Sequence, residues 1–201
     1  MIPLVSIITP TMPSRTGLLA NTAEYVRRQD YARIEWIIEE DRPGARLTVG
    51  EKRNLLVEKA AGEIILHFDD DDYYGPTYVS DMVDSLTSVD FAELRGFYLY
   101  DVRNAIFGYW DLDRAGYTDA HYGFGLAYRR ELFDRCRFPA QNWDEDGQFM
   151  RDVIAAGFQG RHIQDQGRCL HIVHAGSTSR CFPQHQLPRA ELGVKFPGLM
   201  L

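Results

Sequence analysis

The stretch from Leu66 to Pro76 reads LHFDDDDYYGP, and the rest of the chain is organised around it. It begins inside an apolar run, Glu63 to Phe68, which has the length of a strand and directly follows Gly62. A short apolar run that begins after a turn residue predicts a buried β-strand. The four consecutive aspartates then lie at the carboxyl end of that strand.

These four aspartates need a neutralising partner. In an extended backbone alternate side chains share a face, so we expect Asp69 and Asp71 on one side and Asp70 and Asp72 on the other. Adjacent carboxylates repel each other, and some take up protons unless a cation neutralises them. Mg²⁺ and Mn²⁺ bind carboxylates and fill their other positions with phosphate oxygens and water. The stretch therefore predicts a strand-end site for a metal-bound phosphate. The alternative is a solvated acidic turn, or the acidic start of a helix ahead of Pro76.

Composition narrows the class of protein. The chain has 201 residues, 45% of them hydrophobic and 25% charged, which suits one domain with a core that needs no disulfides. The formal net charge of −7 argues against a general nucleic-acid-binding surface. Cys136, Cys169 and Cys181 lack metal-type spacing, which indicates reduced thiols. We find neither a signal peptide nor a membrane-spanning stretch, so we expect a cytoplasmic protein, with peripheral attachment to a membrane left open.

The first half of the chain alternates strands and helices. This order predicts a parallel α/β sheet with right-handed crossovers. Ligands of such sheets bind beyond the carboxyl ends of the strands, which places Thr9 to Thr11, Glu40, Asp41 and the four aspartates around one crevice. The expected strands are Leu4 to Thr9, Ile34 to Glu39 and Glu63 to Phe68, and the expected helices are Ser14 to Arg28, with Leu18, Leu19, Ala23 and Val26 inward, and Glu51 to Ala61.

The second half is less regular. We expect loops or a hairpin in the aromatic segment from Phe107 to Phe124, and an irregular tail after Pro183. Between these segments the pattern predicts a helix from Pro76 to Leu86, strands at Phe91 to Val102 (broken at Gly96), Gly125 to Arg129 and Cys169 to Val173, a short helix from Arg130 to Asp134, and a helix capped at Asn142 to Asp144 that runs through Ala156.

Taken in order, four blocks of the sequence resemble GT-A fold glycosyltransferases, above all the inverting group called family 2. The blocks are VSIITPTMPSR, then GEKRN with GEIILHFDDDDYYGP, then GFGLAYRRELF with NWDEDGQFMRDVIAAGF, and finally HIVHAGSTSR. The resemblance implies an α/β, Rossmann-like fold with a mainly parallel central sheet flanked by helices. It also implies one domain, with a nucleotide-sugar-binding half over about 1–102, an acceptor-side half over about 103–180 and a tail over 181–201. The segment between Tyr100 and Tyr122 has no counterpart in the resemblance.

The resemblance implies a metal site that holds Mn²⁺ or Mg²⁺. Asp69 and Asp71 match the outer acids of the family's Asp-x-Asp motif, and Asp71 is the direct ligand. Asp69 or Asp70 would contact the ribose or a metal-bound water. His174 matches a further metal ligand, and an imidazole favours Mn²⁺ over Mg²⁺. His171 lies within the last strand, and we interpret it as a core histidine.

The resemblance also implies nucleotide contacts, commonly to UDP. Asp41, or Glu40 as second choice, would accept a hydrogen bond from the base, and its alternative is a solvated loop acid. Lys52 and Arg53 open a helix and would suit the diphosphate or the base, and their alternative is an exposed charged turn. The first loop would contact the nucleoside, largely through its backbone, with Thr9, Pro10, Thr11 and Arg15.

Catalysis is expected from the Glu145–Asp146 pair. Inversion needs an acceptor hydroxyl to attack opposite the leaving diphosphate while a carboxylate takes its proton. The resemblance points to Asp146 as that base, with Glu145 beside it or binding the acceptor. Capping of the helix is the alternative role, and the two roles are compatible. Trp110, Trp143, Tyr73, Tyr74 and Tyr122 are interpreted as core aromatics rather than as platforms for sugars.

The expected partners are a nucleotide-diphosphate sugar, above all a UDP-sugar, and an unidentified acceptor hydroxyl. Two other functions remain open: a nucleotidyltransferase acting on sugar phosphates, and a non-catalytic module that binds nucleotide-sugars. A nucleotidyltransferase normally has a glycine-rich first loop, whereas this chain has TPTMPSR with no glycine before Gly17.

Overall fold

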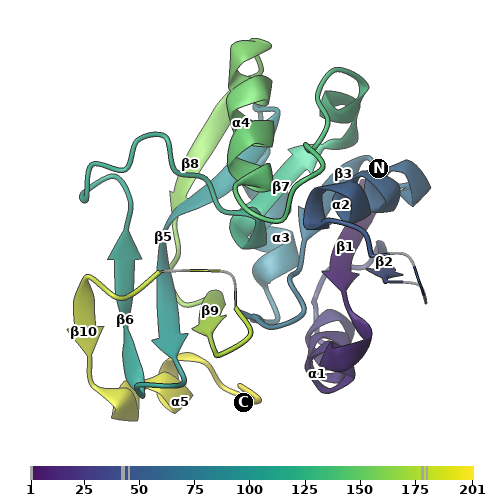
Figure 1. Cartoon of the computed structure of the whole chain (residues 1–201). Coiled ribbons are helices and arrows are strands. Elements are labelled where there is room, and N and C mark those ends of the chain that lie inside the picture. The colour runs from purple at the N-terminus through teal and green to yellow at the C-terminus, as the bar shows by residue number, and fades with distance from the viewer. Residues whose placement is uncertain (1, 42–43, 45, 178, 180) are drawn as a thin grey trace.

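The first three long strands form the parallel part of a mixed sheet. The computed structural model describes residues 2–41, 44, 46–177, 179 and 181–201. Strand β1 pairs in parallel with β2 on one side and with β3 on the other, and helices α1 and α2 make the two connections (Figure 1). The carboxyl ends of these strands therefore meet at one edge of the sheet. The bounds are β1 Val5–Thr11, α1 Thr16–Arg27, β2 Ile34–Glu40, α2 Val49–Lys59 and β3 Ile64–His67.

The rest of the chain extends the sheet from β3. In the described part of the chain the strand order is β10-β6-β5-β7-β3-β1-β2, with β7 antiparallel to β3 and to β5. Strand β5 also pairs in parallel with β8 and then with β9, and β4 pairs with β9. The remaining bounds are β4 Tyr73–Tyr74, α3 Tyr78–Ser85, β5 Phe91–Asp101, β6 Ile106–Asp111, β7 Leu126–Arg129, α4 Glu145–Ala155, β8 Gly160–Gln164, β9 Cys169–Val173, β10 His185–Leu187 and α5 Leu192–Lys195.

Helix α2 presents two buried basic residues at its start. Thr48 accepts a hydrogen bond from the amide of Glu51, and the Glu51 carboxylate accepts one from the amide of Thr48, which forms a capping box. Gly50 allows the close approach of a neighbouring loop, since a Cβ there would lie 1.8 Å from the Pro139 carbonyl oxygen. The capped first turns then hold Lys52 and Arg53, both buried, beside the carboxyl end of β1.

Several sequence predictions are confirmed and others need correction. The aromatic segment does form a hairpin, because β6 pairs antiparallel with β5. Strand β1 runs through Pro10 to Thr11, and α1 starts at Thr16 after a 3-10 turn, with Thr22 and Tyr25 as its buried residues instead of the predicted leucines. Helix α2 spans Val49–Lys59, so it starts earlier than predicted and ends before Gly62. Strand β8 was not predicted, because its sequence GRHIQ is mostly polar and exposed.

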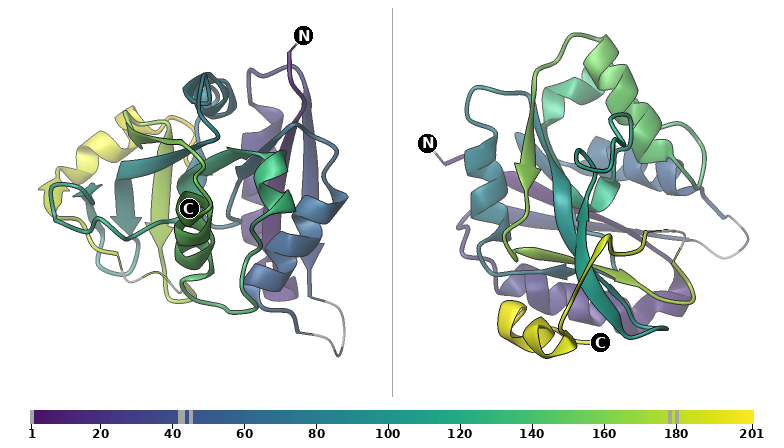
Figure 2. Two further views of the ribbon diagram at one scale, coloured as in Figure 1. Left: turned by 90° about the horizontal axis from the view of Figure 1, so that it is seen from above. Right: turned by 90° about the vertical axis from the view of Figure 1, so that its left-hand side faces the viewer.

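The C-terminal tail is ordered, which contradicts the prediction of an irregular segment. It contains β10 and α5, and the side chain of Phe196 is fully buried in the core. The Tyr25 hydroxyl accepts a hydrogen bond from the Met200 amide, so the end of the chain lies beside α1 (Figure 2, right). The prediction failed because Phe196 packs on Tyr73 and Tyr98, which lie far away in the sequence.

The three cysteines are free and buried, as predicted. Among the helices in the described part of the chain, none is long and apolar enough to cross a membrane.

Candidate active site

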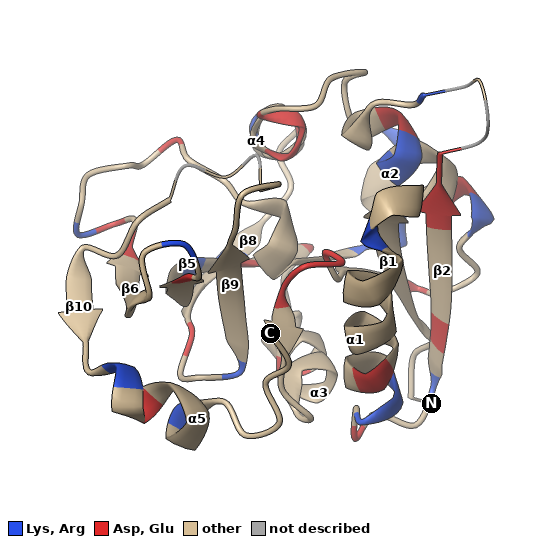
Figure 3. Ribbon diagram, turned by 60° about the horizontal axis from the view of Figure 1, so that its bottom comes forward, with Lys and Arg blue, Asp and Glu red and all other residues tan. Residues whose placement is uncertain are grey.

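The four aspartates form a turn and contact four different parts of the molecule. The expectation that they alternate along an extended strand is wrong, because β3 ends at His67 and the chain turns at Asp70 and Asp71. Figure 3 shows this acidic turn between α1 and β9, and the turn is hydrogen-bonded to both elements. The four carboxylates therefore differ in their contacts: Asp69 contacts Arg53, Asp72 contacts His171, and Asp70 and Asp71 share Arg15.

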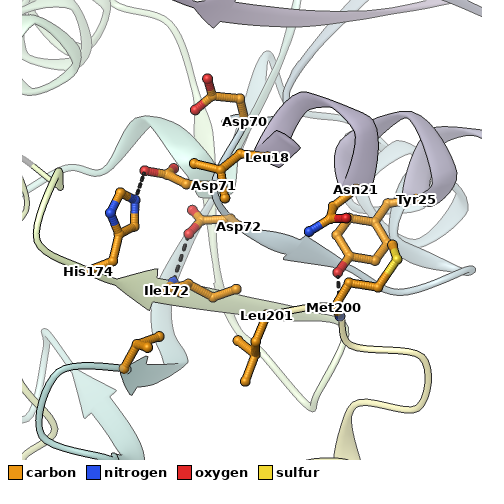
Figure 4. A pocket seen from close by; sticks show the side chains of 11 residues that line it. Leu18, Asn21, Tyr25, Asp70, Asp71, Asp72, Ile172, His174, Met200 and Leu201 are labelled. Carbon is orange, nitrogen blue, oxygen red and sulfur yellow. Dashed lines mark hydrogen bonds and ion pairs between the residues drawn. The ribbon is translucent and has the colours of Figure 1, made fainter. Parts of the chain in front are cut away.

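Asp71 lies between an imidazole and a guanidinium. Its Oδ2 lies 3.0 Å from Nε2 of His174 and 3.0 Å from Nη1 of Arg15 (Figure 4). Burial raises the pKa of the Asp71 carboxyl, but the hydrogen bond with His174 and the charge of Arg15 outweigh burial, so this pKa lies below its ordinary value. The charged form of Asp71 is therefore favoured, with Arg15 as its counter-charge.

The Asp71–His174 pair has the spacing of two metal ligands. Adjacent ligands of an octahedral ion with bonds of about 2.1 Å lie about 3.0 Å apart. Nδ1 of His174 accepts a hydrogen bond from the Gly176 amide at 3.0 Å, so Nε2 carries the proton here. Binding an ion through Nε2 requires that proton to leave and the loop at Gly176 to adjust. Among the described residues no group of three His, Cys, Asp or Glu is placed to hold a metal.

Arg15 contributes its side chain, whereas the sequence predicted mainly a backbone contact. Its Nη1 donates to Asp70 at 2.7 Å, and its Nη2 donates to the Gly176 carbonyl at 2.9 Å. Burial raises the pKa of Asp70, while the hydrogen bond from Thr11 and the charge of Arg15 lower it, and the net direction is upward. Arg15 thus ties the first loop to the acidic turn and to the loop after β9.

Asp72 faces away from this group and pairs with His171. Its Oδ1 lies 3.0 Å from Nδ1 of His171 and accepts the amide of Ile172 at 2.8 Å. Burial alone would lower the pKa of His171, but the charge of Asp72 and the hydrogen bond to it raise that pKa to about 10. The pair fixes the acidic turn to β9, and His171 is buried, as interpreted from the sequence, although it also contributes to the lining of the large cavity described below.

Arg53 is a buried cation that joins three carboxylates. Its guanidinium lies 2.6 Å from Glu145, 3.3 Å from Asp69 and 4.0 Å from Asp146, and only 3% of the residue is exposed. A Cβ on Gly123 would lie 2.4 Å from Nη2 of Arg53, so glycine is what allows this packing. Burial raises the pKa of Asp69 to about 7, with Arg53 opposing and the other aspartates adding to the rise. Asp69 therefore pairs with Arg53. It does not join Asp71 and His174 as a third potential metal ligand, as the sequence had suggested.

The start of α4 holds Asp146 in a fixed orientation. Its Oδ2 accepts the amide of Gly123 at 2.5 Å, and its Oδ1 accepts the amide of Gly147 at 2.8 Å. The neighbouring Glu145 is committed to Arg53, and burial raises the pKa of its carboxyl even though Arg53 opposes the rise. Asp146 is thus the member of the pair whose carboxylate is oriented by backbone amides rather than by a buried ion pair.

Lys52 links the end of β2 to the first loop. Its Nζ lies 2.9 Å from Asp41 and donates to the Thr11 carbonyl at 2.6 Å. Burial raises the pKa of Asp41, but the hydrogen bond and charge of Lys52 outweigh it and hold that pKa below its ordinary value. Glu40, the second choice, is exposed. The structure thus brings Asp41 and Lys52 together as one charged pair.

One cavity of about 810 Å³ collects most of these residues. Its lining includes predicted binding residues Pro10, Thr11, Arg15, Lys52, Arg53, Asp69, Asp70 and Asp71, and the pair Glu145 and Asp146. Thr9 is not among them, because it is fully buried and its Oγ1 accepts a hydrogen bond from Trp36. Asp41 does not line the cavity itself, but its partner Lys52 does. A second cavity of about 140 Å³ adjoins the acidic turn and is lined by His174, Asp72 and the C-terminal Leu201 (Figure 4).

Several aromatic side chains line the large cavity. The sequence pattern had assigned them to the core or had not identified them. Trp143 is 70% exposed and lines the cavity, so its interpretation as a core aromatic is wrong, whereas Tyr73 and Tyr74 are buried as interpreted. Tyr117 and Phe182, both exposed, also line it. Tyr117, Trp143 and Phe182 lie in three separate irregular segments, where no periodic pattern of hydrophobic residues marks them.

The sequence matches no protein-family model and no curated protein. Among solved structures it is similar to TarS from S. aureus, with a TM-score of 0.66 at 16% identity over 85% of this chain and 37% of that one. TarS 1-349 in complex with UDP-GlcNAc gives 0.68 at 16% identity over 89% and 61%. The mannosyltransferase PcManGT from Pyrobaculum calidifontis, in complex with GDP-Man and Mn²⁺, gives 0.66 at 16% identity over 90% and 59%. The chain thus spans between about a third and three fifths of the length of these proteins, and the likeness establishes the GT-A fold predicted from the sequence.

Proposed function

We propose that this chain of GT-A fold is a glycosyltransferase that moves a sugar from a nucleotide-diphosphate sugar to an acceptor hydroxyl. One observation carries the proposal. A single cavity has an acidic turn with basic partners on one wall and the oriented carboxylate of Asp146 on another. The same cavity can therefore bind the donor and remove a proton from the acceptor. The division into a donor half (about 1–102) and an acceptor half (about 103–180) is part of the proposal.

The donor diphosphate is assigned to the acidic turn. Asp71 and His174 would hold Mn²⁺ or Mg²⁺, which when bound screens the diphosphate and stabilises the charge that develops as it leaves. Arg15 and Lys52 line the same cavity and supply charge-assisted hydrogen bonds to phosphate oxygens. Asp41 lies next to Lys52 and is assigned to the base, with uracil as the preferred base. Complexes of the similar structures contain UDP-GlcNAc, UDP and GDP-Man, which supports a nucleotide-sugar donor of this general class.

Asp146 is assigned as the general base of an inverting reaction. The acceptor oxygen forms a bond to the anomeric carbon on the face opposite the diphosphate, the bond to the diphosphate oxygen breaks, and the hydroxyl proton passes to Asp146. Its hydrogen bonds from Gly123 and Gly147 keep the carboxylate in place for this transfer. Glu145 supports the base indirectly, because it neutralises Arg53 beneath it.

Two alternatives are less well supported. A nucleotidyltransferase needs a phosphate-cradling first loop, whereas here β1 runs through Pro10 to Thr11 and the 3-10 turn that follows, Pro13–Arg15, directs Arg15 into the acidic turn. A non-catalytic module has no need for an oriented carboxylate opposite the diphosphate position. The arrangement of Asp71, Arg53 and Asp146 around one cavity favours transfer over both.

Mass spectrometry of reaction products tests this proposal. The protein is incubated with Mn²⁺ and a panel of UDP- and GDP-sugars, with and without a mixture of sugar acceptors. We expect release of a nucleoside diphosphate together with a product heavier by one sugar residue. Formation of a nucleotide-sugar from a nucleoside triphosphate and a sugar phosphate would indicate the nucleotidyltransferase instead. Binding of a nucleotide-sugar with neither product would indicate the non-catalytic module.

A further inference from the structure

Two charged side chains are buried within the otherwise apolar strand β5. Glu93 and Arg95 are each 1% exposed, although the surrounding sequence FAELRGFYL is largely hydrophobic. Both side chains reach the same loop after β6, because Arg95 contacts the carbonyls of Tyr117 and Ala120 and Glu93 contacts His121. They were not singled out from the sequence, although a charged pair inside an apolar strand is a usable signal.

Arg95 fastens the loop that follows β6. Its Nε donates to Asp113 at 3.0 Å, while Nη1 and Nη2 donate to the carbonyls of Ala120 at 2.5 Å and Tyr117 at 2.7 Å. The Leu112 amide donates to the Arg95 carbonyl at 2.9 Å. One buried guanidinium thus holds both ends of the segment 113–120, whose second half, from Gly116 on, lines the large cavity.

Glu93 fastens the next residue of this loop, His121. Glu93 Oε2 lies 2.8 Å from Nδ1 of His121, and Oε1 lies 3.2 Å from Nε2 of His162 on β8. Burial raises the pKa of Glu93, but the hydrogen bonds with His121 and His162 outweigh it and keep that pKa below its ordinary value. The ionised carboxylate makes Nδ1 of His121 the donor, which leaves Nε2 for other partners. His121 lines the large cavity, and His162 does not.

We call the contacts of Glu93 and Arg95 with the segment 113–121 the clamp. The clamp is better explained by a role in positioning this segment than by a contribution to stability. Burying charged groups costs several kcal/mol of desolvation, which their mutual attraction barely repays, so such pairs contribute little net stability. Here both charges act on one short loop, and they fix the Tyr117 ring and the His121 imidazole on the same cavity wall. The Tyr117 ring stacks on Trp110, with centroids 5.8 Å apart and 19° between planes, yet 52% of Tyr117 stays exposed. An aromatic face held by stacking, beside an imidazole Nε2 for which the described residues provide no hydrogen bond, is a preformed binding surface.

We propose that Tyr117 and His121 form the acceptor subsite and that the acceptor presents a sugar ring to it. A sugar ring has an apolar C–H face, which packs on an aromatic ring, and hydroxyls that can donate to Nε2 of His121. Glu93 and Arg95 act as positioning residues beneath the subsite. The assignment rests on the proposed function, since it names the acceptor of that reaction.

NMR of the histidine imidazoles tests the subsite without requiring turnover. Labelled protein is titrated with methyl α- and β-glycosides of glucose, galactose, mannose and N-acetylglucosamine, with and without UDP and Mg²⁺. We expect at least one glycoside to shift the His121 imidazole signals and leave those of His162 in place. Tyr117→Ala should weaken this glycoside by about three- to tenfold, as expected for loss of one aromatic contact, and His121→Gln by about fivefold.

His162→Ala is the matched control, because it removes a partner of the same Glu93 carboxylate from outside the cavity. It should change glycoside affinity by less than about twofold. The subsite is refuted if no glycoside shifts His121, or if His121→Gln and His162→Ala weaken binding equally, which would point to a structural role of the cluster. Failure of both UDP and GDP to bind would overturn the proposed function instead, and glycoside binding without a nucleotide still tests the subsite.

Discussion

Replacing Asp71 with asparagine should abolish the effect of Mn²⁺ or Mg²⁺ on UDP affinity. Asp71 is the acid that faces His174, and the charge of Arg15 and the hydrogen bond with His174 keep its pKa low, so it offers a full negative charge at neutral pH. The asparagine keeps the shape but removes that charge. In the unsubstituted protein we expect the divalent ion to strengthen UDP binding by about 100-fold or more, since it neutralises the diphosphate.

Isothermal calorimetry with UDP, in metal and in chelator, measures this effect. Asp84→Asn is the matched control, because it removes the same charge from an exposed position on α3 that lies outside both cavities. The control should retain the metal dependence of the unsubstituted protein. Equal UDP affinity in metal and chelator before any substitution would show that the acidic turn does not recruit a cation for the nucleotide.

Replacing Asp146 with asparagine should lower kcat by about 10²-fold or more, as expected for loss of a general base. Its carboxylate is oriented by the amides of Gly123 and Gly147, and an asparagine keeps the shape without the basicity. UDP affinity should change little, because the base acts on the acceptor hydroxyl and not on the diphosphate. Steady-state kinetics and UDP titration on the same sample separate the two effects.

Two further variants show whether the effect is specific to the Asp146 carboxylate. Asp152→Asn changes an exposed acid on the same helix and should leave kcat near its original value. Glu145→Gln should act differently from Asp146→Asn, because it leaves Arg53 buried without its nearest counter-charge and should lower the unfolding free energy by about 3–5 kcal/mol. Full turnover by folded Asp146→Asn protein would move the base to another carboxylate, with Glu145 and Asp144 as the next candidates.

The parts of the fold that depend on local pattern could be predicted from the sequence. The apolar run before the aspartates, the strand–helix alternation and the acids at the start of α4 are local signals, and they located the carboxyl edge of the sheet. The turn of the aspartates was not predicted, because it is set by His171 and His174, which lie about a hundred residues away. The side-chain role of Arg15 was missed for a similar reason, because Asp70 and Asp71 lie 55 and 56 residues away from it in the sequence.

Burial decided the remaining differences. Thr9 was expected to contact the nucleoside as part of the first loop. Its side chain is instead fully buried and accepts a hydrogen bond from Trp36. Trp143 is a large hydrophobic residue and was therefore expected in the core, yet it is exposed and lines the cavity. The clamp of Glu93 and Arg95 could have been suspected from two charges in an apolar strand, but its target loop follows from the β5–β6 hairpin and cannot be read from spacing.

The most direct test of the donor site is a crystal structure with UDP and Mn²⁺, measured at the manganese absorption edge. The account predicts an anomalous peak between the Asp71 carboxylate and the His174 imidazole, with the diphosphate beside it in the large cavity and the uracil toward Asp41. A nucleotide bound elsewhere, or UDP in the cavity with no manganese at Asp71, would contradict it.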